Sequence, residues 1–235
     1  MLKNFIFDID DTLYDQMDPF RRALTEVFPD LDQDRAPIWY KKSRYISDTE
    51  FPGLAFDPEG IKQMQIKRIQ SPLADDGIDI SSEQGWAFQE AYQRYQKDLD
   101  LQDDMRQVLD LVKEADQAMG VITNGETAKQ WAKVATMGLT DWIPEAYILV
   151  SEEVGVAKPE REIFDLICQR MGIRPEDSVY FGDNFKHDMV AAKEAGFYTV
   201  WLNHRDREFE GVDDYVDQVC MNFPEVLTWV QKNLK

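Results

Sequence analysis

Short apolar runs alternate with amphipathic stretches along the second part of the chain. Apolar residues recur at three- and four-residue intervals between Met105 and Val112, a spacing typical of one face of a helix. The same pattern and its flanking turn signals predict helices over 126–137, 159–171 and 186–195. Runs with the length and composition of buried strands lie at 118–122, 146–150, 179–181 and 198–202. This alternation predicts an α/β fold, with a doubly wound, Rossmann-like parallel sheet as its core and helices on both faces.

Residues 15 to 99 interrupt the alternation with helical patterns alone. Helices are predicted over 19–28, 36–46, 61–73 and 82–99, with turn signals at 51–53 and 75–77 between them. Ser81 or Ser82 can cap the last of these helices. We therefore predict an α/β core formed by residues 1–14 and 100–235, and an all-helical cap domain inserted between them at 15–99.

Composition narrows the classes of partner. The 235 residues are 43% hydrophobic and carry a formal net charge of −19, which disfavours a nucleic-acid polymer or an anionic membrane as partner. No window approaches the roughly 20 apolar residues of a membrane span, and the chain starts without a secretory signal, so we expect a cytoplasmic protein. Cys168 and Cys220 require no disulfide. A small phosphorylated substrate is compatible with this net charge, because a cation at the binding site can outweigh the negative potential of distant residues, which salt screens.

Two carboxylates, Asp8 and Asp10, come directly after an apolar run that reads as a buried strand. Alternate residues of an extended segment project to one side, so both carboxylates can face one point while the Thr12 hydroxyl ties the turn. In a chain with 45 Asp and Glu residues, an acidic turn also arises by chance. The spacing alone therefore leaves a chemical site and an acidic turn open.

The segment Phe7–Tyr14 resembles the first motif of the haloacid dehalogenase (HAD) superfamily of phosphohydrolases. Segments similar to its other three motifs follow in order: 121–125, 155–159, and 182–184 with Asp188 beyond. Each alone is a common turn or helix start, and their joint order is what is specific. The stretches around 123–125 and 151–159 are most similar to the group of pyrimidine 5′-nucleotidases within that superfamily.

The resemblance implies a role for each matching residue. Asp8 is implied as the nucleophile that forms an aspartyl-phosphate, and Asp10 as the general acid and base. Magnesium is implied on Asp8, Asp183 and the backbone carbonyl of Asp10. A carboxylate and a phosphate dianion repel each other unless a cation lies between them. Lys158 is implied as the positive charge opposite the metal, where it also binds the phosphate.

Three further positions have supporting roles in the resemblance. Thr123 and Asn124, with the backbone amide after them, are implied to bind the transferring phosphoryl group. Asp188 is implied to orient Lys158 or a metal-bound water. Pro159 suits the first position of the following helix.

The sequence thus indicates a magnesium-dependent phosphatase that hydrolyses a small phosphate monoester. Dehalogenases of the superfamily lack the second carboxylate that Asp10 provides, and its sugar-phosphate mutases carry an early histidine that this chain lacks. A pyrimidine nucleoside 5′-monophosphate is one candidate substrate, with Trp39, Tyr40 and Tyr45 either stacking on the base or forming the core of the cap. The alternatives are a sugar-phosphate or phosphoglycolate phosphatase, or a non-catalytic binding protein with this fold. A monomer and a homodimer stay equally open.

Overall fold

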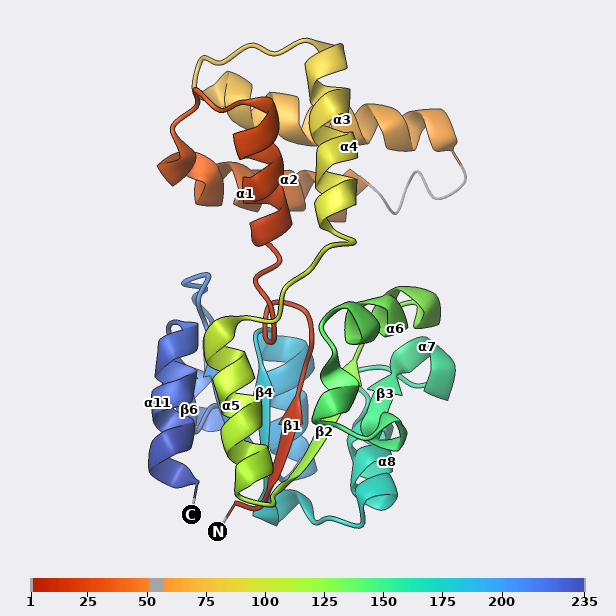
Figure 1. The fold of residues 1–235 in the computed structure, drawn as a ribbon, viewed down its shortest axis with the longest axis vertical. Coiled ribbons are helices and arrows are strands. Elements are labelled where there is room, and N and C mark those ends of the chain that lie inside the picture. The colour runs from red at the N-terminus through yellow and green to blue at the C-terminus, as the bar shows by residue number, and fades with distance from the viewer. Residues whose placement is uncertain (1, 51–56, 235) are drawn as a thin grey trace. The chain divides into compact units, whose positions relative to one another are not determined.

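The computed structural model describes residues 2–50 and 57–234. The chain divides into two compact units, Met1–Asp15 with Asp100–Lys235, and Gln16–Leu99 (Figure 1). The first unit, called here the α/β unit, contains all the strands of the described residues. The second, the helical unit, has four α-helices and one 3₁₀ turn, Gln33–Arg35, among its described residues.

A six-stranded parallel sheet in the order β3-β2-β1-β4-β5-β6 forms the centre of the α/β unit. Its strands are β1 (Asn4–Phe7), β2 (Ala118–Thr123), β3 (Ile148–Val150), β4 (Ser178–Gly182), β5 (Tyr198–Leu202) and β6 (Gln218–Cys220). The prediction of a doubly wound α/β core is confirmed. The strand predicted over 146–150 starts later, because Glu145–Tyr147 forms a 3₁₀ turn.

The register of the three central strands levels their carboxyl ends. Phe7 at the end of β1 lies opposite Val121 of β2 and Phe181 of β4. Residues that follow these positions therefore gather at one edge of the sheet, beyond the strand ends, where ligands of such sheets bind.

Each face of the sheet is covered by helices, so every β1 residue is buried. On one face, Ile6 and Tyr180 pack in a cluster with residues of α8 (Arg161–Met171) and α9 (Ala191–Ala195). On the other, the Phe181 ring lies 5.7 Å, centroid to centroid, from Trp229 of α11 (Phe223–Asn233), which packs against α5 (Asp103–Glu114). Burial on both faces explains why the strands read as continuous apolar runs.

Two predicted helices of the α/β unit differ from the observed ones. The helix predicted from Pro159 begins at Arg161, because the Glu160 amide donates to the Ala157 carbonyl and closes a turn first. The helix predicted over 186–195 consists of a π-helical segment, Phe185–Val190, followed by α9. The remaining α-helices of the described part of this unit are α6 (Thr127–Thr136), α7 (Ser151–Val154) and α10 (Val212–Tyr215).

The helical unit contains α1 (Asp18–Val27), α2 (Ala36–Glu50), α3 (Pro58–Asp75) and α4 (Ser82–Tyr95). Ser81 caps α4, since its hydroxyl accepts from the Gln84 amide and the Gln84 side chain accepts from the Ser81 amide. Gly77 has a φ of 75° in the turn after α3. The turn predicted at 51–53 lies outside the described residues.

An aromatic core holds the helical unit together. The Phe20 ring makes edge contacts with the rings of Tyr40, Phe88 and Tyr92 at centroid distances of 5.0–5.8 Å. Trp39 is 1% exposed, and its indole donates to Asp76. Base stacking by Trp39 and Tyr40, one of the two interpretations from the sequence, is therefore wrong, because both rings are packed in this core.

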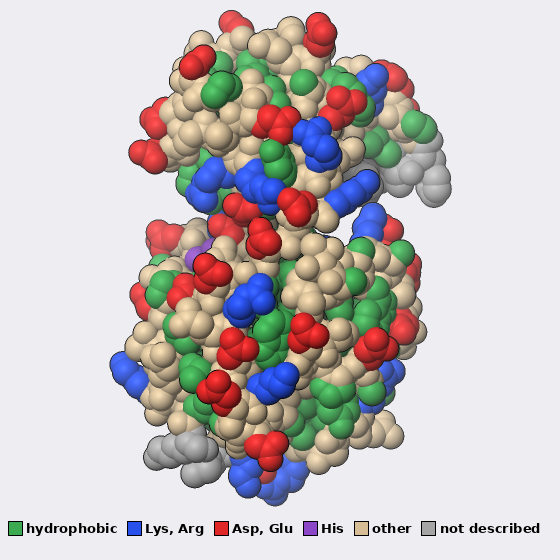
Figure 2. Space-filling model, viewed as in Figure 1, with side chains coloured by type: hydrophobic (Ala, Val, Ile, Leu, Met, Phe, Trp, Pro, Cys, Tyr) green, Lys and Arg blue, Asp and Glu red, His purple; other side chains and the backbone are tan. Residues whose placement is uncertain are grey.

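On the face drawn in Figure 2, acidic side chains are spread over both units with lysines and arginines among them. Within the described part of the chain, no helix has both the length and the apolar character needed to cross a bilayer.

Candidate active site

Asp8 is placed at the carboxyl end of β1 and is 5% exposed. Its amide donates to the Phe181 carbonyl at 2.9 Å, which continues the pairing between β1 and β4. Beyond it the chain turns, and the Ile9 carbonyl accepts from the Leu13 amide at 2.9 Å. The prediction that the Thr12 hydroxyl ties this turn is wrong: the hydroxyl is buried without a hydrogen-bond partner, and backbone bonds close the turn.

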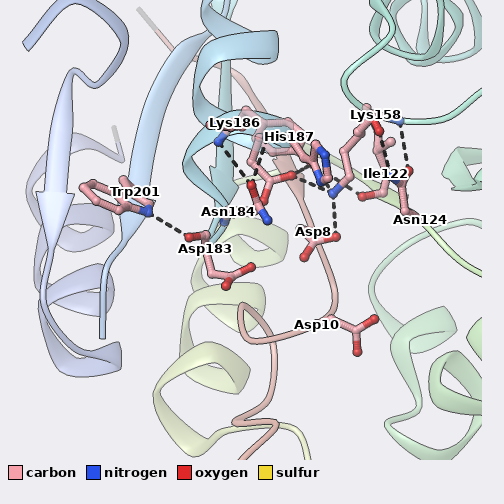
Figure 3. Close-up of polar contacts among 12 residues, drawn as sticks. Asp8, Asp10, Ile122, Asn124, Lys158, Asp183, Asn184, Lys186, His187 and Trp201 are labelled. Atoms are coloured by element: carbon pink, nitrogen blue, oxygen red, sulfur yellow. Dashed lines mark hydrogen bonds and ion pairs between the residues drawn. The ribbon is translucent and has the colours of Figure 1, made fainter. Parts of the chain in front are cut away.

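Lys158 points its ammonium group at Asp8 (Figure 3). Its Nζ donates to Asp8 Oδ1 at 2.7 Å and to Asp188 Oδ1 at 2.6 Å, and lies 3.1 Å from the Tyr180 hydroxyl. The residue is 5% exposed. A buried ammonium between two carboxylates satisfies its donors with charge-assisted bonds. The site therefore has a cation fixed beside the carboxylate predicted as nucleophile.

The main chain at Lys158 is held by Asn124. The Asn124 side chain donates to the Lys158 carbonyl at 2.8 Å and accepts from the Lys158 amide at 2.9 Å. These reciprocal bonds fix the loop after α7 against the end of β2. The side-chain amide of Asn124 is therefore committed to Lys158, which differs from the phosphate contact that the sequence predicts for it.

Other donors predicted to bind phosphate differ in their availability. The Gly125 amide donates to the Ser151 hydroxyl at 3.0 Å, so it is bonded within the protein. The Thr123 hydroxyl is buried without a hydrogen-bond partner. A buried hydroxyl in this state costs free energy unless a ligand completes it. Thr123 is thus the member of the predicted group whose bonding the protein leaves incomplete.

Gly182 allows Asp188 to reach the site. A Cβ on Gly182 would lie 2.5 Å from the Asp188 carboxyl carbon, a distance that real atoms do not adopt. Asp188 Oδ2 also accepts from the Asn184 amide at 3.0 Å. The close approach of the π-helical segment to the end of β4 therefore requires a residue without a side chain at this position.

Three carboxylates meet at the carboxyl edge of the sheet. Asp8, Asp183 and Asp188 each offer an oxygen, and these oxygens lie within 4.8 Å of one another. Hard oxygen donors in this number fit a hard divalent ion such as magnesium. Asp183 is also the residue whose carbonyl accepts from the Trp201 indole at 2.8 Å, so its main chain is fixed.

Burial shifts the charges of this cluster. Burial raises the pKa of Asp8 well above its usual value, and the neighbouring carboxylates add to this rise while Lys158 opposes it. Burial, Asp188 and Asp11 raise the pKa of Asp183 to about 7. Burial alone lowers the pKa of Lys158, but Asp188 and Asp8 outweigh it, and the pKa stays well above its usual value. The crowded carboxylates thus favour added positive charge.

Asp10 lies apart from this cluster in Figure 3, below Asp8 in the view and away from Lys158. Lys133 of α6 donates to both of its carboxylate oxygens, at 2.6 and 2.7 Å, and Gln130 donates to Oδ2 at 3.1 Å. The Tyr14 hydroxyl also donates to Asp10. These partners of Asp10 are not predicted from the sequence motifs. The one sequence feature that points to them is the three-residue spacing of Gln130 and Lys133, which places both side chains on one face of the helix after the second motif.

The fold and these residues agree with the comparison to protein families. The chain belongs to the haloacid dehalogenase-like hydrolase family, whose model matches residues 2–196. In three dimensions it is similar to the HAD-hydrolase YfnB of Bacillus subtilis, a structure bound to magnesium, with a TM-score of 0.64 and 20% identity over 97% of this chain and 98% of that chain. Identity at this level shows a common fold.

Similarity to curated proteins extends over parts of the chain. Glyceraldehyde 3-phosphate phosphatase of Methanocaldococcus jannaschii is 37% identical over 120 residues, which are 50% of each chain. Pyrimidine 5′-nucleotidase YjjG of Escherichia coli is 39% identical over 92 residues, 38% of this chain and 40% of that protein. (S)-2-haloacid dehalogenase of Pseudomonas putida is 25% identical over 99% of this chain and 98% of its own. This chain spans about half the length of the phosphatase it matches.

Proposed function

We propose that the protein is a magnesium-dependent phosphatase that hydrolyses a small phosphate monoester through an aspartyl-phosphate. The observation that carries the proposal is the position of Asp8, a buried carboxylate bonded to Lys158 and clustered with Asp183 and Asp188. Similarity to the glyceraldehyde 3-phosphate phosphatases and to a pyrimidine 5′-nucleotidase supports the same reaction class.

Asp8 and Asp183 would hold the magnesium ion, together with the backbone carbonyl of Asp10. The ion supplies positive charge that lowers the repulsion between a carboxylate and a phosphate dianion. A carboxylate oxygen of Asp8 attacks phosphorus, the ester P–O bond breaks, and Asp8 becomes an acyl phosphate. Lys158 stabilises the charge on the phosphoryl oxygens, and the Thr123 hydroxyl donates to one of them.

Asp10 moves the protons of both half-reactions. In the first, its carboxyl group gives a proton to the leaving alkoxide, which departs as the alcohol. In the second, the Asp10 carboxylate takes a proton from water, whose oxygen attacks phosphorus while the bond to Asp8 breaks. Inorganic phosphate leaves and Asp8 returns as a carboxylate. Lys133, Gln130 and Tyr14 would orient Asp10 through the bonds that they make to its carboxylate.

The helical unit is proposed to act as a cap that selects the substrate. The candidate substrates are pyrimidine nucleoside 5′-monophosphates and small sugar or triose phosphates, in line with the two kinds of phosphatase similar to this chain. With Trp39 and Tyr40 buried, Tyr45 is the remaining aromatic candidate for stacking on a base, at 70% exposure. Replacing Tyr45 by alanine tests this role through the ratio of kcat/KM for UMP and for a hexose phosphate.

The match to a haloacid dehalogenase along the whole chain supports a second candidate, release of halide from a 2-haloacid. This reaction also starts with attack by a carboxylate such as Asp8. Two features favour the phosphatase: Asp10 and the three-carboxylate cluster. Cleavage of a carbon–halogen bond requires neither the proton donor that Asp10 would provide nor the divalent cation that the cluster would bind.

One assay distinguishes the candidates. Purified protein is incubated with UMP, glyceraldehyde 3-phosphate, phosphoglycolate, glucose 6-phosphate and 2-chloropropionate, with magnesium or with EDTA, and released phosphate or chloride is measured. We expect phosphate release that needs magnesium and is lost in Asp8→Asn, with Lys129→Met as an active control. Phosphate release by Asp8→Asn at the wild-type rate, or chloride release alone, would refute the proposal.

A further inference from the structure

Arg207 forms an ion pair with Asp183, one of the three carboxylates of the cluster. Its guanidinium donates to Asp183 Oδ2 at 2.8 Å and to the Asp183 carbonyl at 3.2 Å. It lies on the segment between β5 and α10, which has no role in the reaction proposed above. Lys158 pairs with Asp8 and Asp188, whereas the ion pair described for Asp183 is the one with Arg207.

The main chain at Arg207 is fixed in place. The Arg207 amide donates to the Asn203 side chain at 2.8 Å, and the Asn203 side chain donates to the Arg207 carbonyl at 2.9 Å. Asn203 is itself buried. The backbone amide of Asn203 donates to the Cys220 carbonyl at 2.8 Å, which ties the segment to β6 of the sheet. The Arg207 side chain that contacts Asp183 is therefore attached to a main chain held by hydrogen bonds, unlike the side chain of an arginine on a mobile surface loop.

The side chain of Arg207 has room to leave. It is 37% exposed, against 4% for the Lys158 side chain in the same cluster. A guanidinium keeps its positive charge at every pH that a folded protein tolerates. Its charge can therefore leave Asp183 by movement of the side chain into solvent, which this exposure allows.

We propose that Arg207 is a resident counter-ion of Asp183 that a divalent ion must displace, so that it lowers the affinity of the site for magnesium. The inference rests on the magnesium site proposed above. The guanidinium engages the carboxylate of Asp183 that would bind the metal, and its charge repels a second cation nearby. Arg207 therefore sets the magnesium concentration at which the site fills and keeps Asp183 paired until then.

Magnesium binding to the purified full chain tests the proposal. Isothermal titration with MgCl₂ after EDTA treatment gives the Kd of wild type, Arg207→Gln and Arg207→Lys, and circular dichroism checks that each is folded. We expect Arg207→Gln to bind magnesium about tenfold more tightly, since it removes a competing charge. Arg207→Lys, which keeps the charge, should stay within about threefold of wild type.

Two further variants separate this effect from simpler ones. Arg174→Gln removes an arginine paired with Asp177 in the same unit, and it should leave the Kd unchanged if net charge alone is not the cause. Asp183→Asn should abolish the tight binding, which locates the measured ion at this cluster. Equal or weaker binding by folded Arg207→Gln overturns the role of Arg207 alone. Absence of magnesium binding in both wild type and Arg207→Gln overturns this role and the proposed metal site together.

Discussion

Replacement of Lys158 by methionine tests how the buried cluster is balanced. The change keeps the length of the side chain and removes the charge that lies 2.7 Å from Asp8 and 2.6 Å from Asp188. Breaking a buried ion pair costs about 3–5 kcal/mol, because the remaining charge is left without a partner. For a chain of this size each kcal/mol lowers Tm by about 2–4 °C, so we expect a fall of about 6–20 °C.

Lys129→Met is the matched control for this measurement. Lys129 pairs with Glu126 on the surface, where the two side chains are 69% and 60% exposed. Exposed pairs contribute about 0–1 kcal/mol, so this variant should lose less than about 4 °C. Thermal unfolding is followed by circular dichroism in EDTA, which excludes metal binding as a cause. A fall of Tm in Lys158→Met no larger than in Lys129→Met would show that the cluster does not depend on the lysine.

The pH dependence of Lys158→Met supplies a second check with a definite sign. Burial already raises the pKa of Asp8, and loss of the lysine removes the group that opposes this rise. A carboxyl group whose pKa is higher in the folded state than in the unfolded state contributes stability at low pH and loses it as pH rises. The deficit in Tm should therefore be smaller at pH 5 than at pH 8, and the double variant with Asp188→Asn should recover part of it.

Three other changes give sharp expectations. Gly182→Ala places a methyl group against the Asp188 carboxyl and should cost about 1–3 kcal/mol of unfolding free energy and most of the turnover; an unchanged Tm and kcat would contradict this. Asn124→Ala leaves two backbone groups unpaired and should lower kcat more than it raises KM in steady-state assays, whereas a change in KM alone would indicate direct binding of substrate. Burial raises the pKa of Cys220 to about 12, so iodoacetamide at pH 8 should modify it in urea and not in the native protein, as mass spectrometry would show.

The sheet could be predicted because its information is local. Each buried strand is a continuous apolar run, and the residues that follow β1, β2 and β4 reach one edge whatever the length of chain between them. The positions of Asp8, Asn124 and Asp183 follow from this rule, whereas Lys158 lies beyond α7 and is bound to the sheet edge through Asn124. The elements β6 and α11 are absent from the prediction, and β6 offers little pattern because its three residues are only partly apolar.

The charged partners of the site could not be predicted in the same way. Lys133 is 123 residues from Asp10 along the chain, and an arginine on a loop such as Arg207 has the sequence appearance of any surface residue. The hydroxyl of Thr12 shows the opposite error, since a common turn motif gives way to backbone bonds once the turn is buried. Predictions from neighbouring residues fail where a polar group forms its hydrogen bonds with residues that are distant along the chain.

The place of β1 in the sheet has a consequence during synthesis of the chain. Asn4 pairs with Ala118 on one side and with Ser178 on the other, so its two neighbours are made 114 and 174 residues later. At about 5–20 residues per second, β1 waits roughly 10–35 s for its second partner. The helical unit, contiguous from Gln16 to Leu99, is complete in the meantime and can fold on the ribosome first. The nascent chain therefore carries an unpaired apolar strand throughout this interval, and an exposed strand of this kind is prone to aggregation until β2 and β4 are made.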